Sequence, residues 1–287
     1  MTRPLLELDD IHVEFPSKGF RAKPVEVLHG VSLRIDAGET LGVVGESGSG
    51  KTTIGRTVLG LVSPSAGRVV LDGTDITHLN GRRRRALAKD VQVVFQDPYT
   101  SLNPSMTIGE ILAEPLVMLG VGKTEARSRV RTLLDRVGLP SDSVYRRPRE
   151  FSGGQRQRVA IARALAPRPR LIVCDEPVSA LDLSTQARVL ELLLEIQRET
   201  GVAYLFISHD LAVIRHISHR AAVVYHGDIV ETGPAAQVTL DPEHPYTQRL
   251  LLAAPVANPA EQQQRRANRL RLREQQRLQD EQAGAIA

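Results

Sequence analysis

The chain has 287 residues, of which 41% are hydrophobic and 24% are charged, as in globular proteins with one large domain or two small ones. Its net charge of +4 is compatible with phosphate ligands or an anionic membrane surface. The single cysteine, Cys174, excludes a disulfide framework or a cysteine-built metal site within the chain. One cysteine also fits a reducing compartment.

The sequence contains no membrane-targeting or membrane-spanning pattern. Acidic residues at Glu7, Asp9 and Asp10 interrupt the place where a signal-peptide core would lie. A run of about 18 apolar residues, enough to span a bilayer, does not occur. We therefore expect a protein of the cytosol, or one held by partners at the cytoplasmic face of the cell membrane.

Hydrophobic periodicity predicts an α/β fold. Apolar and polar residues alternate over residues 6–15 and 31–35, which predicts two half-buried strands, with an exposed loop over 16–25 between them. Further strands are predicted at residues 40–44, 68–71, 91–95, 171–174, 203–207 and 221–225. Helical spacing is found over residues 51–61, 107–137, 159–166, 185–199 and 211–217. Strand–helix alternation on both sides of the block at 107–137 predicts an α/β core with a helical insert.

Two basic segments are interpreted as solvated surface. Residues 82–85 are four consecutive arginines, but aromatic residues make up only 3% of the chain, too few for base-stacking platforms. We therefore predict no nucleic-acid partner. After Pro259 the chain is rich in Gln, Arg and Glu, which predicts an exposed helix or a disordered tail over 259–287.

The strongest local motif fits the pattern G-x-x-x-x-G-K-[ST] between a predicted strand and a predicted helix. Its residues are Gly45, Glu46, Ser47, Gly48, Ser49, Gly50, Lys51 and Thr52, and we add the adjacent Thr53 to the binding set. Glycines let backbone N–H groups wrap a phosphate, and the helix start adds its positive dipole end. Lys51 is expected to reach the β- and γ-phosphates and Thr52 to coordinate Mg²⁺. The alternative is a glycine-rich turn with a surface lysine.

A second motif follows the apolar strand at residues 171–174. Asp175 and Glu176 stand at its carboxyl end, where ligands bind in parallel sheets. We expect Asp175 to hold Mg²⁺ through water and Glu176 to polarise the attacking water, which implies hydrolysis. The alternative is a carboxylate pair that caps the next turn.

A third motif, Ser152-Gly153-Gly154-Gln155, precedes the helical run at 159–166. A hydroxyl, free amides and a helix dipole make an anion cradle. The same residues form the capping-box pattern S-x-x-Q, and both interpretations can hold. A second phosphate site without a second glycine loop serves a nucleotide bound to another chain.

Together these motifs resemble the ATP-binding subunits of ABC transporters, over residues 5–256. The resemblance identifies the three motifs as Walker A, Walker B and the signature. It implies that Gln96 touches Mg²⁺ and senses the transmembrane partner, that Asp182 in Ser179-Ala180-Leu181-Asp182 acts across a dimer, and that His209 contacts the γ-phosphate. The residues agree, because Gln96 and His209 follow predicted strands.

The resemblance also implies an architecture. It is a P-loop NTPase (RecA-like) core with an antiparallel β-subdomain and an inserted α-helical subdomain. We expect an ATPase domain over 1–240, with its core at 1–96 and 167–240 and the helical subdomain at 97–166. A C-terminal extension over 241–258 and the tail over 259–287 follow. Phe15 is the candidate for stacking on the adenine ring, and Phe20 is the alternative residue for that role. A second alternative is that Phe15 belongs to the strand core and does not contact adenine.

Two further segments narrow the resemblance. Residues 94–104 and His244-Pro245-Tyr246-Thr247 are similar to the peptide and nickel importer branch, and residues 155–165 resemble the second ATPase subunit of oligopeptide and dipeptide importers. The resemblance implies a second, different ATPase subunit, two permease subunits and an extracytoplasmic substrate-binding protein. The chain lacks the cysteine cluster that holds an iron–sulfur group in some members.

We therefore expect an ATP hydrolase that uses ATP and Mg²⁺ to power uptake of oligopeptides or dipeptides. Alternatives are the same motor for nickel or another small solute, a soluble ABC ATPase of DNA repair or translation, and a P-loop nucleotide kinase. One cassette without a coiled-coil or zinc insertion argues against the repair and translation factors. A kinase needs neither the signature motif nor Glu176.

Overall fold

The computed structural model describes residues 3–16 and 23–253. Its centre is a six-stranded sheet in the order β10-β9-β3-β8-β7-β6. Five strands are parallel, and β10 pairs antiparallel with β9 at one edge. The bounds are β3 (Thr40–Val44), β6 (Val91–Val94), β7 (Leu171–Asp175), β8 (Ala203–Ser208), β9 (Arg220–Tyr225) and β10 (Asp228–Pro234).

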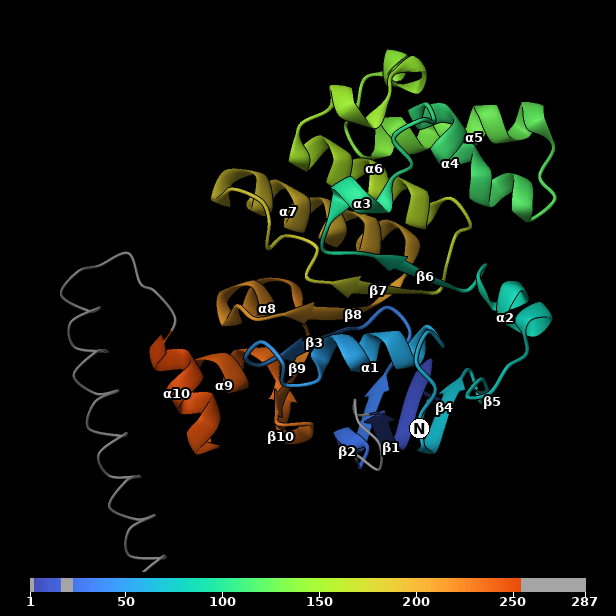
Figure 1. Ribbon diagram of the computed structural model, residues 1–287. Coiled ribbons are helices and arrows are strands. Elements are labelled where there is room, and N and C mark those ends of the chain that lie inside the picture. The colour runs from blue at the N-terminus through green and yellow to red at the C-terminus, as the bar shows by residue number, and fades with distance from the viewer. Residues whose placement is uncertain (1–2, 17–22, 254–287) are drawn as a thin grey trace, which may run out of the picture.

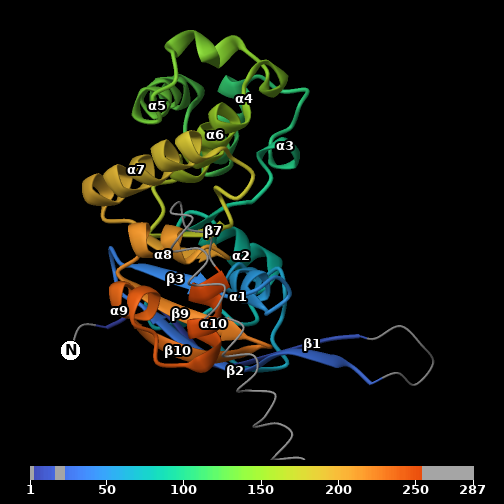
Figure 2. The same cartoon turned by 90° about the vertical axis from the view of Figure 1, so that its left-hand side faces the viewer.

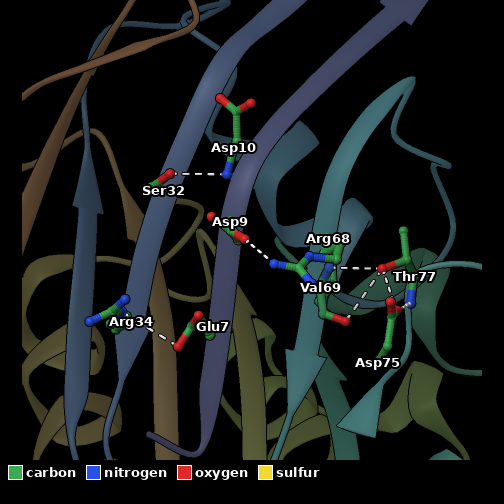
Figure 3. A network of polar contacts seen from close by, with 9 residues as sticks. All are labelled: Glu7, Asp9, Asp10, Ser32, Arg34, Arg68, Val69, Asp75 and Thr77. Atoms are coloured by element: carbon green, nitrogen blue, oxygen red, sulfur yellow. Dashed lines mark hydrogen bonds and ion pairs between the residues drawn. The ribbon is translucent and has the colours of Figure 1, made fainter. Parts of the chain in front are cut away.

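A second, antiparallel sheet has four strands in the order β2-β1-β4-β5. Its strands are β1 (Leu6–Phe15), β2 (Val25–Ile35), β4 (Ala66–Leu71) and β5 (Thr74–Asp75). Charged residues of neighbouring strands face one another across it, as in Arg34–Glu7 at 3.5 Å and Arg68–Asp9 at 2.7 Å (Figure 3). Such exposed pairs add little stability, but the alternation they belong to fixes the register.

Helices cover both faces of the six-stranded sheet. Buried residues of α7 and α8 belong to the core on one face, and those of α1 to the core on the other. Figure 2 shows α8 and α1 on opposite sides of β3, with the antiparallel sheet on the far side of α1 and β3 from the helical layer, and Figure 1 shows the same elements from another side. The helices near the sheet are α1 (Lys51–Val58), α2 (Gly81–Leu87), α7 (Leu183–Thr200), α8 (Leu211–Ile217), α9 (Ala235–Leu240) and α10 (Pro245–Ala253). The outer layer contains α3 (Pro98–Ser101), α4 (Ile108–Met118), α5 (Lys123–Arg136), η1 (Ser141–Tyr145), η2 (Pro148–Glu150) and α6 (Gly153–Leu165).

Alternation along the central strands divides the interior into two cores. Tyr204 and Phe206 of β8 face the helices on one side, in a core that includes residues of α4 to α8. Leu205 and Ile207 face the other side, where α1 and the antiparallel sheet pack. All four side chains are fully buried. A strand buried on both faces has a continuous apolar sequence, which is why β8 could be predicted.

The predicted elements differ from the observed ones at exposed strands and at the short helices α3, α9 and α10, which are not predicted from the sequence. The prediction that residues 16–25 form a loop and that the next strand starts at residue 31 is wrong at its end, because β2 begins at Val25. Its first two residues, Val25 and Glu26, are both exposed, so burial imposes no half-buried pattern on the sequence there. The edge strand β10 was missed for the same reason. The arginines at residues 82–85 lie in α2, none of whose residues is buried.

Within the part of the chain that the structure describes, no helix combines the length and the apolarity needed to cross a bilayer. The tail predicted over 259–287 and the alternative stacking residue Phe20 lie outside the described residues.

Replacing Phe206 by Ala tests the helical side of the sheet. The ring is fully buried, so its removal leaves a cavity and should lower the free energy of unfolding by about 3–5 kcal/mol. Urea denaturation measures this loss. The control is Leu240→Ala on α9, where the side chain is 58% exposed, and there we expect a change within about 0.5 kcal/mol. Equal effects of the two substitutions would contradict the assignment of Phe206 to the core.

Candidate functional site

The glycine-rich loop connects β3 to α1, as the sequence predicts. Gly50 caps α1 with a φ of 109°, a left-handed conformation that favours glycine. A Cβ on Gly45 would lie 2.2 Å from the carbonyl oxygen of Val224, so only glycine fits there. Glu46, Ser47 and Gly48 are exposed at the tip of the loop, while Ser49 is buried and Thr52 and Thr53 are half-buried.

Lys51 lies inside this loop and is 4% exposed. Its Nζ donates a hydrogen bond to the carbonyl oxygen of Glu46 at 2.7 Å. Burial lowers the pKa of Lys51, and the nearby charges of Glu176, Asp175 and Glu46 oppose that shift. The ammonium group therefore lies in a partly desolvated pocket of negative charge, where a phosphate can gain strong hydrogen bonds.

Thr52 and Asp175 meet at the carboxyl end of β7. The Thr52 hydroxyl donates a hydrogen bond to Asp175 Oδ1 at 3.0 Å. Burial raises the pKa of Asp175, while the hydrogen bond from Thr52 opposes the shift. A hydroxyl and a carboxylate at this spacing fit Mg²⁺, which takes oxygen ligands and keeps several waters. Among the described residues there is no cage of three or more His, Cys, Asp or Glu, so the ion would also need ligands from water and substrate.

Glu176 follows Asp175 at the end of β7 and contacts residues at the ends of β6 and β8. Its Oε2 accepts a hydrogen bond from Gln96 Nε2 at 3.4 Å and lies 3.1 Å from His209 Nδ1. Its own N–H donates to the carbonyl oxygen of Ile207 at 3.0 Å. The φ of Glu176 is 48°, in the left-handed region that non-glycine residues rarely adopt. Such local strain is typical of functional sites.

The structure therefore brings together the predicted residues of the first two motifs, with Gln96 and His209. All of them follow β3, β6, β7 or β8 at the carboxyl edge of the sheet. The alternative in which the carboxylates only cap a turn is insufficient, because Asp175 binds Thr52 and Glu176 contacts Gln96 and His209.

Ser152-Gly153-Gly154-Gln155 starts α6, in the outer helical layer (Figure 1). The capping box is present: the Ser152 hydroxyl accepts from the Gln155 amide at 3.4 Å, and Gln155 Oε1 accepts from the Ser152 amide at 2.9 Å. A hollow of about 730 Å³ adjoins this helix start and is lined by residues that include Ser152, Gly154 and Gln155. Within the described residues, no hydrogen bond or ion pair joins the Ser152-Gly153-Gly154-Gln155 motif to the glycine-rich loop.

Asp182 lies beside this motif. It caps α7 by accepting a hydrogen bond from the Thr185 amide at 3.0 Å and another from the Ser184 hydroxyl at 2.7 Å. These hydrogen bonds hold the pKa of Asp182 well below its usual range. A Cβ on Gly154 would lie 2.2 Å from Thr185 Cγ2, so the starts of α6 and α7 are packed directly together.

Phe15 ends β1, opposite Val25 of β2, and is 39% exposed. The alternative that Phe15 belongs to the strand core is therefore wrong. Two residues further along β2, the Val27 carbonyl oxygen lies 3.2 Å from the Cβ position of Gly50, so this end of the hairpin is next to the glycine-rich loop. An exposed ring in that position is available for stacking.

One contact of the loop was missed from the sequence. The Glu46 amide donates a hydrogen bond to the hydroxyl of Tyr246, 200 residues away, at 2.9 Å. The sequence marks Tyr246 only as part of the similar segment from His244 to Thr247. Nothing in the local sequence pattern predicts that this ring reaches the loop.

The chain is similar to known proteins of one family. The family model described as ABC transporter matches residues 28–179. Glutathione import ATP-binding protein GsiA of Salmonella paratyphi A is 47% identical over 268 residues, which are 92% of this chain and 43% of that protein. The same-named protein of Escherichia coli O6:H1 is 49% identical over 269 residues, with the same coverage. The chain thus spans less than half the length of the curated relatives that it matches.

Two solved structures are similar to this chain in fold. The ATP-binding cassette MJ0796, in a dimeric post-hydrolysis state bound to ADP and Pi, matches with a TM-score of 0.72 and 29% identity, over 80% of this chain and 98% of that one. The protein cbiO1 from Clostridium perfringens, part of the transporter complex cbiONQ, matches with a TM-score of 0.73 and 25% identity, over 83% of this chain and 91% of that one.

The two adjacent glycines of the third motif provide a matched test of its packing. Gly154→Ala should lower the free energy of unfolding by about 1–3 kcal/mol, because the new methyl group overlaps Thr185 Cγ2. Gly153→Ala meets only ordinary contacts at 3.8 Å or more and should change stability by about 0.5 kcal/mol or less. Thermal or urea unfolding measures both.

Thr185→Ser removes the methyl group that blocks Gly154 and leaves the hydroxyl in place. Combined with Gly154→Ala, it should restore much of the lost stability. Equal destabilisation by the two glycine substitutions, or no rescue by Thr185→Ser, would contradict the direct packing of α6 on α7.

Proposed function

The chain belongs to the ABC transporter family, whose fold it shares, and from this we propose that it binds and hydrolyses MgATP as the motor subunit of a peptide importer. The observation that carries the proposal is the arrangement around Glu176. Its carboxylate adjoins the Thr52–Asp175 pair and contacts both Gln96 and His209. A base, an oxygen ligand pair and two polar side chains beside a phosphate-binding loop are what ATP hydrolysis requires.

The glycine-rich loop binds the phosphates. The first backbone N–H groups of α1 are available to a phosphate, and the helix dipole favours its negative charge. Lys51 exchanges the carbonyl oxygen of Glu46 for phosphate oxygens. Phe15 stacks on the adenine ring from the neighbouring hairpin.

Magnesium supplies charge neutralisation at the β- and γ-phosphates when it is bound. Thr52 and Asp175 are the residues that would hold it, the first directly and the second through water, with Gln96 as a further ligand. Burial raises the pKa of Asp175, and a bound cation would offset this effect by favouring the charged carboxylate.

Glu176 acts as the general base. It accepts a proton from the attacking water as the water oxygen bonds to the γ-phosphorus and the bond to the β–γ bridging oxygen breaks. His209 contacts the γ-phosphate, and Gln96 links the site to the membrane partner. Because ADP lacks the γ-phosphate, its loss removes the contacts that favour the ATP-bound state.

Each ATP is proposed to bind between two ATPase chains, so every chain also has a second half-site for the nucleotide held by its partner. In this chain the second half-site consists of Ser152 to Gln155 and Asp182. Helix geometry leaves the first amides of α6 without intrahelical acceptors, and the capping box uses only that of Gln155. Those amides have no hydrogen bond to the loop of their own chain among the described residues. The related cassette MJ0796 is a dimer in its ADP- and Pi-bound structure, which supports the pairing.

The cargo assignment rests on the relatives. Those at 47% and 49% identity are named for import of glutathione, a small peptide, which favours a peptide over nickel. We propose that the chain works at the cytoplasmic face of the cell membrane with a second, different ATPase subunit, two permease subunits and an extracytoplasmic binding protein. In this division of labour, residues 1–96 and 167–240 hydrolyse ATP, residues 97–166 face the partners, and residues 241–258 form an extension.

Glu176→Gln tests the catalytic assignment. The amide keeps the shape of the side chain but accepts a proton poorly, so ATP turnover should fall by about 100-fold or more while MgATP binding persists. The protein, mixed with its companion subunit, should then remain an ATP-bound dimer in size-exclusion chromatography. The matched control is Glu191→Gln, which removes a surface carboxylate that contacts His216, and it should leave turnover unchanged. Normal turnover of Glu176→Gln would remove Glu176 from its role.

Reconstitution tests the cargo. The complete proposed complex, with the second ATPase subunit, the two permease subunits and the binding protein, is assembled in lipid vesicles and supplied with MgATP. Radiolabelled glutathione or a dipeptide should accumulate across the vesicle membrane in an ATP-dependent manner, and Ni²⁺ should not. Uptake of Ni²⁺ without peptide uptake would overturn the peptide assignment and leave the ATPase assignment intact.

A further inference from the structure

Tyr246 is the residue of α10 that reaches the candidate ATP site. It is 3% exposed, and its ring lies 4.1 Å from the ring of Tyr225, at the end of β9. Its hydroxyl accepts the hydrogen bond from the Glu46 amide at 2.9 Å. A tyrosine hydroxyl in a buried place normally has a partner, and here that partner is the backbone of the glycine-rich loop.

Glu46 links this contact to Lys51. The Glu46 N–H donates a hydrogen bond to the Tyr246 hydroxyl. The Glu46 carbonyl oxygen accepts hydrogen bonds from Lys51 Nζ at 2.7 Å and from the Ser49 amide at 3.2 Å. A continuous chain of hydrogen bonds therefore runs from the Tyr246 hydroxyl, through the Glu46 residue, to the ammonium group expected to bind phosphate.

The same side of the molecule supports the loop at two more points. The Gly227 amide, in the turn after β9, donates to the carbonyl oxygen of Ser49 at 2.9 Å. The Cβ position of Gly45 lies 2.2 Å from the Val224 carbonyl oxygen. The end of β9 and α10 thus form a wall that contacts the loop at Gly45, Glu46 and Ser49.

The residues just before α10 are fixed to β10. The Glu231 carboxylate of β10 accepts hydrogen bonds from the amides of Glu243 and His244 at 2.9 and 3.1 Å. The Tyr246 amide donates to His244 Nδ1 at 3.2 Å, which orients the first turn of the helix. Tyr246 is consequently held in place by the β9–β10 edge rather than by the loop alone.

We propose that Tyr246 is a positioning residue that holds the glycine-rich loop in its phosphate-binding form and, through Glu46, sets the resting position of Lys51. The proposal rests on the proposed ATP-binding function. A loop with three glycines among its first six residues loses much conformational entropy when it closes on a ligand. A hydrogen bond that orders the loop beforehand reduces this loss and strengthens binding.

Tyr246→Phe in the full chain is the test, because it keeps the ring packed on Tyr225 and removes only the hydroxyl. Tyr225→Phe is the matched control, since it removes a hydroxyl from the neighbouring ring, for which no bond to the loop is present among the described residues. Titration calorimetry with MgADP, which is not hydrolysed, gives the Kd. Hydrogen exchange of the peptide that contains residues 45–52 gives the order of the loop, and thermal unfolding gives the global stability.

We expect Tyr246→Phe to raise the Kd for MgADP by about 2- to 10-fold, the range for loss of one hydrogen bond. Amide exchange should increase in the loop peptide but not in peptides of β8, and Tyr225→Phe should match the unmodified chain. A positioning role also predicts a raised KM for ATP with kcat largely kept. A purely structural role would instead lower the thermal midpoint and accelerate exchange throughout the protein.

Unchanged MgADP affinity and loop exchange in Tyr246→Phe would overturn the inference, as would equal weakening by both variants, which would assign the effect to ring packing. These outcomes leave the ATPase assignment untouched as long as the unmodified chain binds MgADP. Absence of MgADP binding by the unmodified chain would overturn the proposed function, and the Tyr246 inference with it.

Discussion

The parallel pairing of β3, β6, β7 and β8 is the constraint on which the site depends. Parallel strands end at one edge, so the residues that follow them meet there although they are far apart in sequence. Val43 pairs with Ile207, and Asp175 also pairs with Ile207, so the loop after β3 and the carboxylates of β7 flank β8 in register. A slip of one residue in any of these pairs would turn the site residues toward the opposite face.

Burial gives this edge its electrostatic character. Desolvation acts on Lys51 and Asp175 in opposite directions, lowering the pKa of the first and raising that of the second. Each charged form therefore has less solvation than it would have in water. A ligand that supplies both anionic oxygens for the ammonium and a cation for the carboxylate offsets the two costs together. MgATP, the proposed ligand, has both kinds of group.

The sequence predicted those parts whose chemistry is local. The strand at Thr40–Val44 and the start of the next helix at Lys51 are marked by a continuous apolar run and by glycines, and both were predicted correctly. Gln96 and His209 were singled out by the family resemblance, and their positions after strands agree with a place at this edge; their contacts with Glu176 come from the structure. The start of β2 at Val25 and the edge strand β10 were missed because exposed strands need no apolar alternation. Tyr246 was missed as a site residue because its partner, Glu46, is joined to it only by the tertiary fold.

We propose that this sheet edge binds a magnesium nucleotide, one for each chain. Calorimetric titration of the unmodified protein with ATP, with and without Mg²⁺, and of Lys51→Ala under the same conditions, tests it most directly. The account predicts saturable binding of one nucleotide per chain that requires Mg²⁺ for full affinity and is severely weakened in Lys51→Ala. Binding that is independent of both Mg²⁺ and Lys51, or no binding at all, would contradict it.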